Sequence, residues 1–130
     1  NDAKINNYTT LEGMVKKHKA GDEEFNLSQP LIDLYNKKDF GQYADKDGSL
    51  HVNFLTDNDI TGGNSGSPVL NGKGELIGLA FDGNIEAMAG DVIFDDKLQR
   101  TINVDIRFVL FIIEKYAGAK HIIDELTIVK

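Results

Sequence analysis

Residues 62–68 form a glycine-rich stretch that leads directly into a strand–turn–strand pattern, and no other part of the sequence limits the possible folds as strongly. The segment from Pro68 to Leu70 is short and apolar, and the segment from Asn71 to Gly74 is a strong hairpin signal. The apolar run from Leu76 to Phe81 then predicts the returning strand. Further strands are expected at residues 50–55, 92–94 and 101–104. Together these segments indicate a small antiparallel barrel.

The sequence before this region is more polar and is expected to be helical in patches. The stretch from Thr9 to Glu12 has the spacing of a capping box and predicts a short helix. A second helix is expected to begin at Ser28 to Pro30, and a final helix is expected over residues 105–117. We therefore predict a mainly β fold, with a helical lead-in at residues 1–48 and an antiparallel barrel with a terminal helix at residues 49–130.

The composition fits one globular domain and excludes several functions. Of the 130 residues, 41% are hydrophobic and 27% are charged, which is too apolar for a disordered chain. The net charge of −7 argues against a nucleic-acid-binding surface, which needs a basic footprint. Because the chain has no cysteine, disulfides, thiolate metal sites and a cysteine nucleophile are excluded. The longest apolar run, residues 108–113, is too short to cross a membrane.

Ser65 lies inside the glycine-rich stretch and is the candidate nucleophile. The glycines at positions 63 and 66 allow the backbone to turn sharply around it without a Cβ clash. Such a turn can direct the N–H groups of Gly63 and Ser65 at one point, where the oxygen of an attacked carbonyl becomes an oxyanion. A serine hydroxyl also needs a base, usually a histidine that a carboxylate orients.

Two other interpretations of glycine-rich turns fit the sequence less well. A phosphate-binding loop contains a lysine and runs into a helix, whereas this loop has no lysine and runs into a strand. The turn from Asp45 to Gly48 faintly suggests a calcium loop, but the later ligands of that pattern are absent, so a plain turn is favoured. We predict neither a metal ion nor a cofactor.

The residues around Ser65 resemble a known family. Residues 63–68 (Gly-Asn-Ser-Gly-Ser-Pro) are similar to the nucleophile motif of chymotrypsin-like serine peptidases, especially bacterial glutamyl endopeptidases, in which asparagine precedes the serine. The flanking stretches 52–62, 74–91 and 98–107 resemble the C-terminal part of the bacterial dipeptidyl-peptidases 7 and 11. This resemblance covers most of residues 39–126, including long stretches outside the serine motif.

The resemblance implies an exopeptidase that releases dipeptides from peptides with a free N-terminus. It implies a two-barrel, trypsin-like fold with an inserted helical domain, and a periplasmic or cell-surface, usually dimeric, bacterial enzyme. Ser65 then matches the nucleophile, and Gly63 and Ser65 supply the oxyanion hole. Phe81, Asp82 and Gly83 match the substrate-binding segment, in which Asp82 holds the substrate α-amine. Members that select Asp or Glu carry arginine at the position of Gly83, so glycine implies an apolar preference, as in dipeptidyl-peptidase 7.

The general base is expected to lie outside this sequence. In the resembling family the histidine and aspartate precede the serine by a long distance and belong to the other barrel. The three histidines, His18, His51 and His121, lack that context, as do the loop residues Asp57, Asp59 and Asp91. The chain begins at Asn1 rather than methionine, and we expect it to be a segment of a longer protein that is inactive alone. Two alternatives stay open: a glutamyl-type endopeptidase segment and a non-catalytic peptide-binding module.

Overall fold

The computed structural model describes residues 6–89 and 97–129 of the chain. The chain separates into two compact units, each built from two stretches of sequence. The sheet unit contains Asn1–Tyr8 and Asn53–Ile106, and the helical unit contains Thr9–Val52 and Arg107–Lys130. The division predicted from sequence, at residues 48 and 49, stays a prediction.

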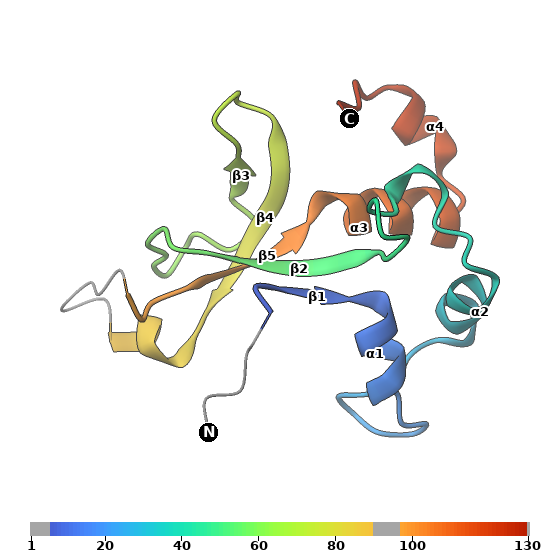
Figure 1. Ribbon diagram of the computed structural model, residues 1–130, viewed down its shortest axis with the longest axis horizontal. Helices are drawn as coiled ribbons and strands as arrows, with labels where there is room; N and C mark the ends of the chain where they lie inside the picture. The colour runs from blue at the N-terminus through green and yellow to red at the C-terminus, as the bar shows by residue number, and fades with distance from the viewer. Residues whose placement is uncertain (1–5, 90–96, 130) are drawn as a thin grey trace. The chain divides into compact units, whose positions relative to one another are not determined.

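Five strands form one sheet in the order β1-β2-β5-β4-β3 (Figure 1). Their bounds are Tyr8–Thr10 for β1, His51–Thr56 for β2, Pro68–Leu70 for β3, Leu76–Gly83 for β4 and Thr101–Asp105 for β5. The β2–β5, β5–β4 and β4–β3 pairs are antiparallel, which confirms the predicted strand arrangement. Closure into a trypsin-like barrel stays a prediction, and the strand expected at residues 92–94 lies outside the described residues.

The β3–β4 hairpin forms where the sequence predicts it. The side-chain oxygen of Asn71 accepts the N–H groups of Lys73 at 2.9 Å and Glu75 at 3.1 Å. Gly74 takes a φ of +79°, which glycine adopts without the steric penalty of a Cβ. The turn is therefore stabilised by its own residues.

A bulge interrupts the β4–β5 pairing in the middle of the predicted substrate-binding segment. Ala80 pairs with Asn103 and Asp82 pairs with Ile102, which leaves Phe81 without a partner residue. A bulge of this kind increases the local twist and redirects the side chains on both sides of it. Phe81 and Asp82, at this irregularity, are both exposed.

The structure contains the three expected helices and a fourth, α4, that the sequence analysis does not predict. They are α1 (Leu11–Lys17), α2 (Gln29–Lys37), α3 (Ile106–Phe111) and α4 (Lys120–Asp124), with 3₁₀ turns η1 (Gly41–Tyr43) and η2 (Ile85–Ala89). The hydroxyl of Thr10 accepts the N–H of Gly13 at 3.3 Å and caps α1. The helix predicted at residues 105–117 is wrong after Phe111, because the chain continues as a π-helical turn, η3 (Ile112–Tyr116).

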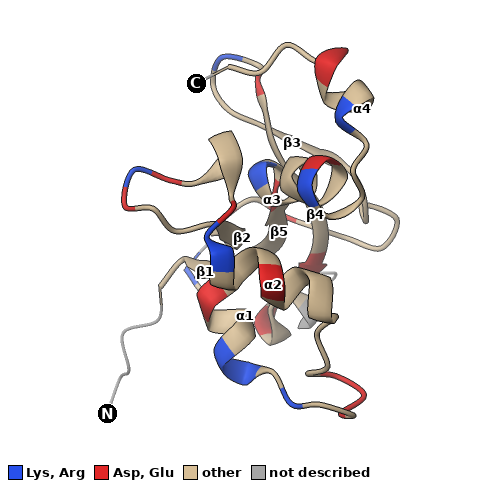
Figure 2. Cartoon of the chain, turned by 90° about the vertical axis from the view of Figure 1, so that its right-hand side faces the viewer, with Lys and Arg blue, Asp and Glu red and all other residues tan. Residues whose placement is uncertain are grey.

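The helical unit has a compact apolar core. Its buried side chains are Leu11, Leu31, Phe40, Tyr43, Leu50, Val52 and Phe111. Phe40 and Phe111 meet edge to face, with ring centroids 6.2 Å apart. On the surface, Lys16 and Glu12 form an ion pair at 2.8 Å across one turn of α1, where Figure 2 shows basic and acidic residues together. Of the described helices, none is long and apolar enough to span a membrane.

Candidate active site

Ser65 lies on a sharp turn between β2 and β3, as the glycine pattern predicts. Gly63 and Gly66, on either side of it, have φ values of +96° and +87°. Gly66 then donates its N–H to the Ala80 carbonyl at 2.7 Å, and the Ala80 N–H donates to the Ser67 carbonyl at 2.9 Å. These two bonds attach the loop to β4, so the position of Ser65 depends on the strand that carries the substrate-binding segment.

The Ser65 hydroxyl is exposed and makes a long hydrogen bond. Its Oγ donates to the Phe81 carbonyl at 3.4 Å, near the limit for such a bond. The N–H groups of Gly63 and Ser65 have no hydrogen-bond acceptor among the described residues. An oxyanion hole needs N–H groups that are free to bind a ligand, and the role of these two groups stays a prediction.

The three predicted substrate-binding residues follow one another on β4. The Phe81 ring is 43% exposed, and the Asp82 side chain is exposed with its Oδ1 accepting the Gly83 N–H at 2.8 Å. A Cβ at Gly83 would lie 2.8 Å from the Ala87 Cβ and 3.3 Å from Ile60 Cγ2. The space beside Gly83 is therefore already occupied by these two apolar side chains.

Asn84 organises the segment after β4, and sequence reasoning missed it. Its Nδ2 donates to the Leu98 carbonyl at 2.8 Å, and its Oδ1 accepts the N–H groups of Arg100 at 2.9 Å and Ala87 at 3.2 Å. Its backbone N–H also donates to the Arg100 carbonyl at 2.9 Å. An asparagine between a strand and a 3₁₀ turn signals such a cap, but its distant partners have no local signal.

A second group of polar residues that the sequence analysis does not predict forms hydrogen bonds to Asn58, in the segment between β2 and the Ser65 loop. The Thr101 hydroxyl donates to the Asn58 carbonyl at 2.7 Å, and the Asn58 side chain donates back to Thr101 Oγ1 at 3.2 Å. Thr56 Oγ1 donates to Asn58 Oδ1 at 2.5 Å and accepts the amide of Asn103 at 2.9 Å. Thr101 and Asn103 are fully buried, so this network connects the loop to the interior of the sheet unit.

All three histidines, His18, His51 and His121, belong to the helical unit, whereas Ser65 belongs to the sheet unit. His18 Nδ1 accepts the N–H of Leu27 at 3.0 Å. His51 Nε2 lies 3.4 Å from Asp45 Oδ2, and His121 is exposed on α4. The predicted absence of a general base from this chain stays a prediction.

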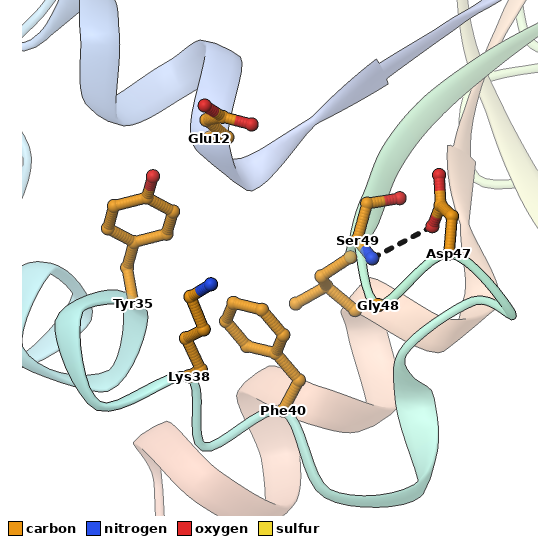
Figure 3. Close-up of a pocket in the computed structure, with 8 residues that line it drawn as sticks. Glu12, Tyr35, Lys38, Phe40, Asp47, Gly48 and Ser49 are labelled. Atoms are coloured by element: carbon orange, nitrogen blue, oxygen red, sulfur yellow. Dashed lines mark hydrogen bonds between the residues drawn. The ribbon is translucent and has the colours of Figure 1, made fainter.

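The pocket in Figure 3 also belongs to the helical unit and is not the candidate active site. It has a volume of about 300 Å³ and is lined by Glu12, Tyr35, Lys38, Phe40, Asp47, Gly48, Ser49 and Leu50. These residues offer both charge signs, and the Ser49 N–H donates to Asp47 at 2.8 Å, but no histidine lines the pocket. Within residues 6–89 and 97–129, no group of three or more histidine, aspartate or glutamate side chains could hold a metal ion.

Comparison with known proteins connects this geometry to a family. Residues 1–128 match the peptidase S46 family. The chain belongs to that family. Dipeptidyl-peptidase 7 of Capnocytophaga gingivalis is 68% identical over 99% of the chain, which spans 18% of that protein's length. The Asp/Glu-specific dipeptidyl-peptidase of the same organism is 50% identical over 95% of the chain, which spans 17% of its length.

A solved S46 structure has the same fold over nearly the whole chain. The crystal structure of Porphyromonas endodontalis DPP11 in complex with the dipeptide Arg-Glu superposes with a TM-score of 0.92 at 45% identity. The match covers 95% of this chain and 18% of that one. The resemblance to the dipeptidyl-peptidases 7 and 11 is thus confirmed, and S46 is a serine-type peptidase family.

Proposed function

We propose that this chain is the nucleophile-bearing segment of a serine dipeptidyl-peptidase that releases dipeptides from free N-termini. The observation that carries the proposal is the meeting of the Ser65 loop with the Phe81–Gly83 segment of β4. The 3.4 Å bond from Ser65 Oγ to the Phe81 carbonyl puts the nucleophile beside the residues expected to hold the peptide. S46 membership supports the same reaction class.

In the proposed reaction, Ser65 Oγ attacks the carbonyl carbon of the second substrate residue. A histidine elsewhere in the longer protein takes the hydroxyl proton, and the Gly63 and Ser65 N–H groups receive the oxyanion. The C–N bond to the third residue then breaks, and the histidine gives its proton to the leaving amine. Water hydrolyses the resulting ester on Ser65 and releases the dipeptide. Each of the two N–H donors contributes about 3–4 kcal/mol to transition-state stabilisation. The absence of another acceptor for either N–H in the described chain supports this role.

Asp82 is the proposed partner of the substrate α-ammonium. Its carboxylate is exposed, and the Gly83 N–H uses one of its oxygens, which leaves the other available. A charge-assisted bond to the ammonium distinguishes a free N-terminus from a blocked one. This contact would make the enzyme an exopeptidase rather than an endopeptidase.

The proposed preference at the second substrate residue is apolar. Gly83 brings no charge, and the adjacent Ala87 and Ile60 side chains are apolar. The 68% identity to a dipeptidyl-peptidase 7, against 50% to an Asp/Glu-specific enzyme of the same organism, supports this choice. The preference is a difference in transition-state binding, so it is measured as a ratio of kcat/KM values.

We further propose that the rest of the longer protein covers the sheet unit. Five large apolar residues of this unit are between 43% and 78% exposed: Leu70, Leu76, Phe81, Ile85 and Leu98. Exposed large apolar residues in such number support an interface with another part of the protein. The proposed arrangement is a first barrel and a helical domain around this segment, in a homodimeric enzyme of the periplasm or cell surface.

The proposal is tested on a full-length protein that contains this chain. Chromogenic dipeptide substrates with an apolar or an acidic second residue are compared, each with a free and an acetylated N-terminus. We expect turnover of the free apolar substrate, and its loss in the Ser65→Ala variant. Turnover of the acetylated substrate would indicate an endopeptidase, and inactivity towards all four would indicate a peptide-binding module.

A further inference from the structure

Asn64 closes the turn that immediately precedes Ser65. Its Oδ1 accepts two hydrogen bonds from Thr61, one from the N–H at 2.8 Å and one from the hydroxyl at 3.2 Å. Its own N–H donates back to the Thr61 carbonyl at 3.2 Å, and its carbonyl accepts the N–H of Ser67 at 2.9 Å. Asn64 is therefore tied to residues on both sides of the nucleophile.

The residues enclosed by this turn are Gly62 and Gly63. No atom lies within 4 Å of the place where a Cβ of either glycine would stand, so neighbouring side chains do not restrain them. Gly63 has a φ of +96°, one of several conformations open to glycine. Ordering one residue costs about 1–2 kcal/mol of backbone entropy, and glycine loses the most. The bonds between Asn64 and Thr61 oppose this loss.

The two ends of the loop are attached to the sheet by other bonds. Upstream, the Asn58 carbonyl accepts the Thr101 hydroxyl at 2.7 Å. Downstream, the Gly66 N–H donates to Ala80 at 2.7 Å. Removal of the Asn64 side chain therefore leaves both attachments in place. It also leaves the two backbone bonds of Asn64, to the Thr61 carbonyl and from the Ser67 N–H, and removes only the two side-chain bonds to Thr61. The peptide groups of Gly62 and Gly63 then keep one bond across the turn instead of three.

We propose that Asn64 is a positioning residue for the oxyanion hole. Its side-chain oxygen, held by Thr61, fixes the direction of the Gly63 N–H before a substrate binds. The inference rests on the proposed function, since it concerns the same Ser65 reaction. Preorganised donors act mainly in the transition state, so the effect belongs in kcat rather than KM.

The experiment compares variants of the full-length protein. In Asn64→Ala we expect kcat to fall about 10- to 100-fold and KM to change less than about threefold. This fall in kcat is smaller than the roughly 10²–10³-fold fall that follows complete removal of one oxyanion-hole donor. Asn64→Asp keeps an acceptor of the same shape but adds a negative charge near the oxyanion, so its kcat is expected to fall less than that of Asn64→Ala, and added salt should reduce the part of the loss that the charge causes. Thr61→Val, which removes only the 3.2 Å bond, should lower kcat by a smaller factor.

A ligand pair separates positioning from general damage to the fold. A dipeptide boronic acid forms a tetrahedral adduct on Ser65, whose oxygen occupies the oxyanion hole, whereas the product dipeptide makes no such adduct. Asn64→Ala should weaken boronate binding about as much as it lowers kcat and leave product binding within about twofold. Asn71→Ala is the matched control, because Asn71 also accepts two N–H groups within a turn but lies in the β3–β4 hairpin.

The outcomes are distinct from those that test the proposed function. If the parent protein releases dipeptides and Ser65→Ala does not, the reaction itself stands. Unchanged kcat in Asn64→Ala would then overturn the positioning role, as would equal losses in Asn64→Ala and Asn64→Asp. An equal effect on boronate and product binding would also overturn it. If Asn64→Ala does not fold, the Thr61→Val result decides between the same alternatives.

Discussion

Gly78 lies in the middle of β4, where the structure leaves no room for a side chain. A Cβ built at this position would be 2.6 Å from the Val104 carbonyl oxygen, and 2.7 Å and 2.8 Å from two ring carbons of Phe54. Ordinary contacts begin at 3.4 Å, so an alanine requires movements of 0.6–0.8 Å (3.4 minus 2.8 and 3.4 minus 2.6). The Phe54 ring can turn, but Val104 belongs to the β5 ladder and resists movement.

We expect Gly78→Ala to destabilise the chain by about 1.3 kcal/mol. Overpacking of this kind costs about 1–3 kcal/mol, and the lower entropy of the unfolded alanine chain offsets about 0.4–1 kcal/mol. With a slope of about 2 kcal/mol/M, urea unfolding followed by circular dichroism should show the transition midpoint lowered by about 0.6 M at unchanged slope. Gly72→Ala is the matched control, because no atom lies within 4 Å of its Cβ position.

A second substitution tests whether the Phe54 ring causes the strain. Phe54→Leu removes both close ring carbons, so the double variant with Gly78→Ala should be more stable than the sum of the single effects by about 1 kcal/mol. Strictly additive effects would refute the assigned contact. A midpoint within about 0.2 M of the parent in Gly78→Ala would refute the packing argument as a whole.

Three further predictions concern activity and pH. The 130-residue chain alone should release no dipeptide from an apolar chromogenic substrate, and turnover that disappears in Ser65→Ala would contradict this. Burial raises the pKa of Tyr43 to about 12, so the folded state disfavours the ionised phenolate. The free energy of unfolding that this group contributes is fully present below about pH 10 and should be lost as the pH rises to about 12. Tyr43→Phe should abolish this part of the loss. The Lys46 N–H and the Arg107 guanidinium hold the pKa of Asp45 below its usual value. Asp45→Asn should therefore lower the urea midpoint at pH 7 and have less effect as the pH falls below about 4.

Local patterns predicted the parts of the fold that depend on local interactions. The β3–β4 hairpin was predicted from residues 71–74, and its turn is indeed held by Asn71 within that stretch. The start of α1 is predicted to within one residue, because the capping-box spacing points to Thr9, three residues before Glu12, whereas the structure uses the Thr10 hydroxyl to accept the Gly13 N–H. The end of the helix expected at residues 105–117 is not predictable in this way, because its pattern of apolar residues does not distinguish an α-helix from the π-helical turn at Ile112–Tyr116.

The candidate site divides in the same way. The turn around Ser65 could be predicted, since its glycines and the adjacent strand lie within seven residues. The network of Asn58 and Thr101 could not, because its two members are 43 residues apart. The bonds of Asn84 to Arg100 span 16 residues and leave no local pattern either. Polar side chains that connect distant strands become visible only when the sheet is assembled.

The Ser65 loop depends on hydrogen bonds within this chain, whereas the proposed catalytic base does not. The loop that carries the Gly63 and Ser65 N–H groups is held by bonds that begin and end within the sheet unit, at Thr61, Asn64 and Ala80. In the proposed enzyme, the base and its orienting carboxylate would come from outside this chain and would require the rest of the protein to fold against it. The proposed oxyanion hole would then form independently of the catalytic base. Substitutions in the missing part that displace the base should then lower acylation of Ser65 while leaving binding to the oxyanion hole largely intact.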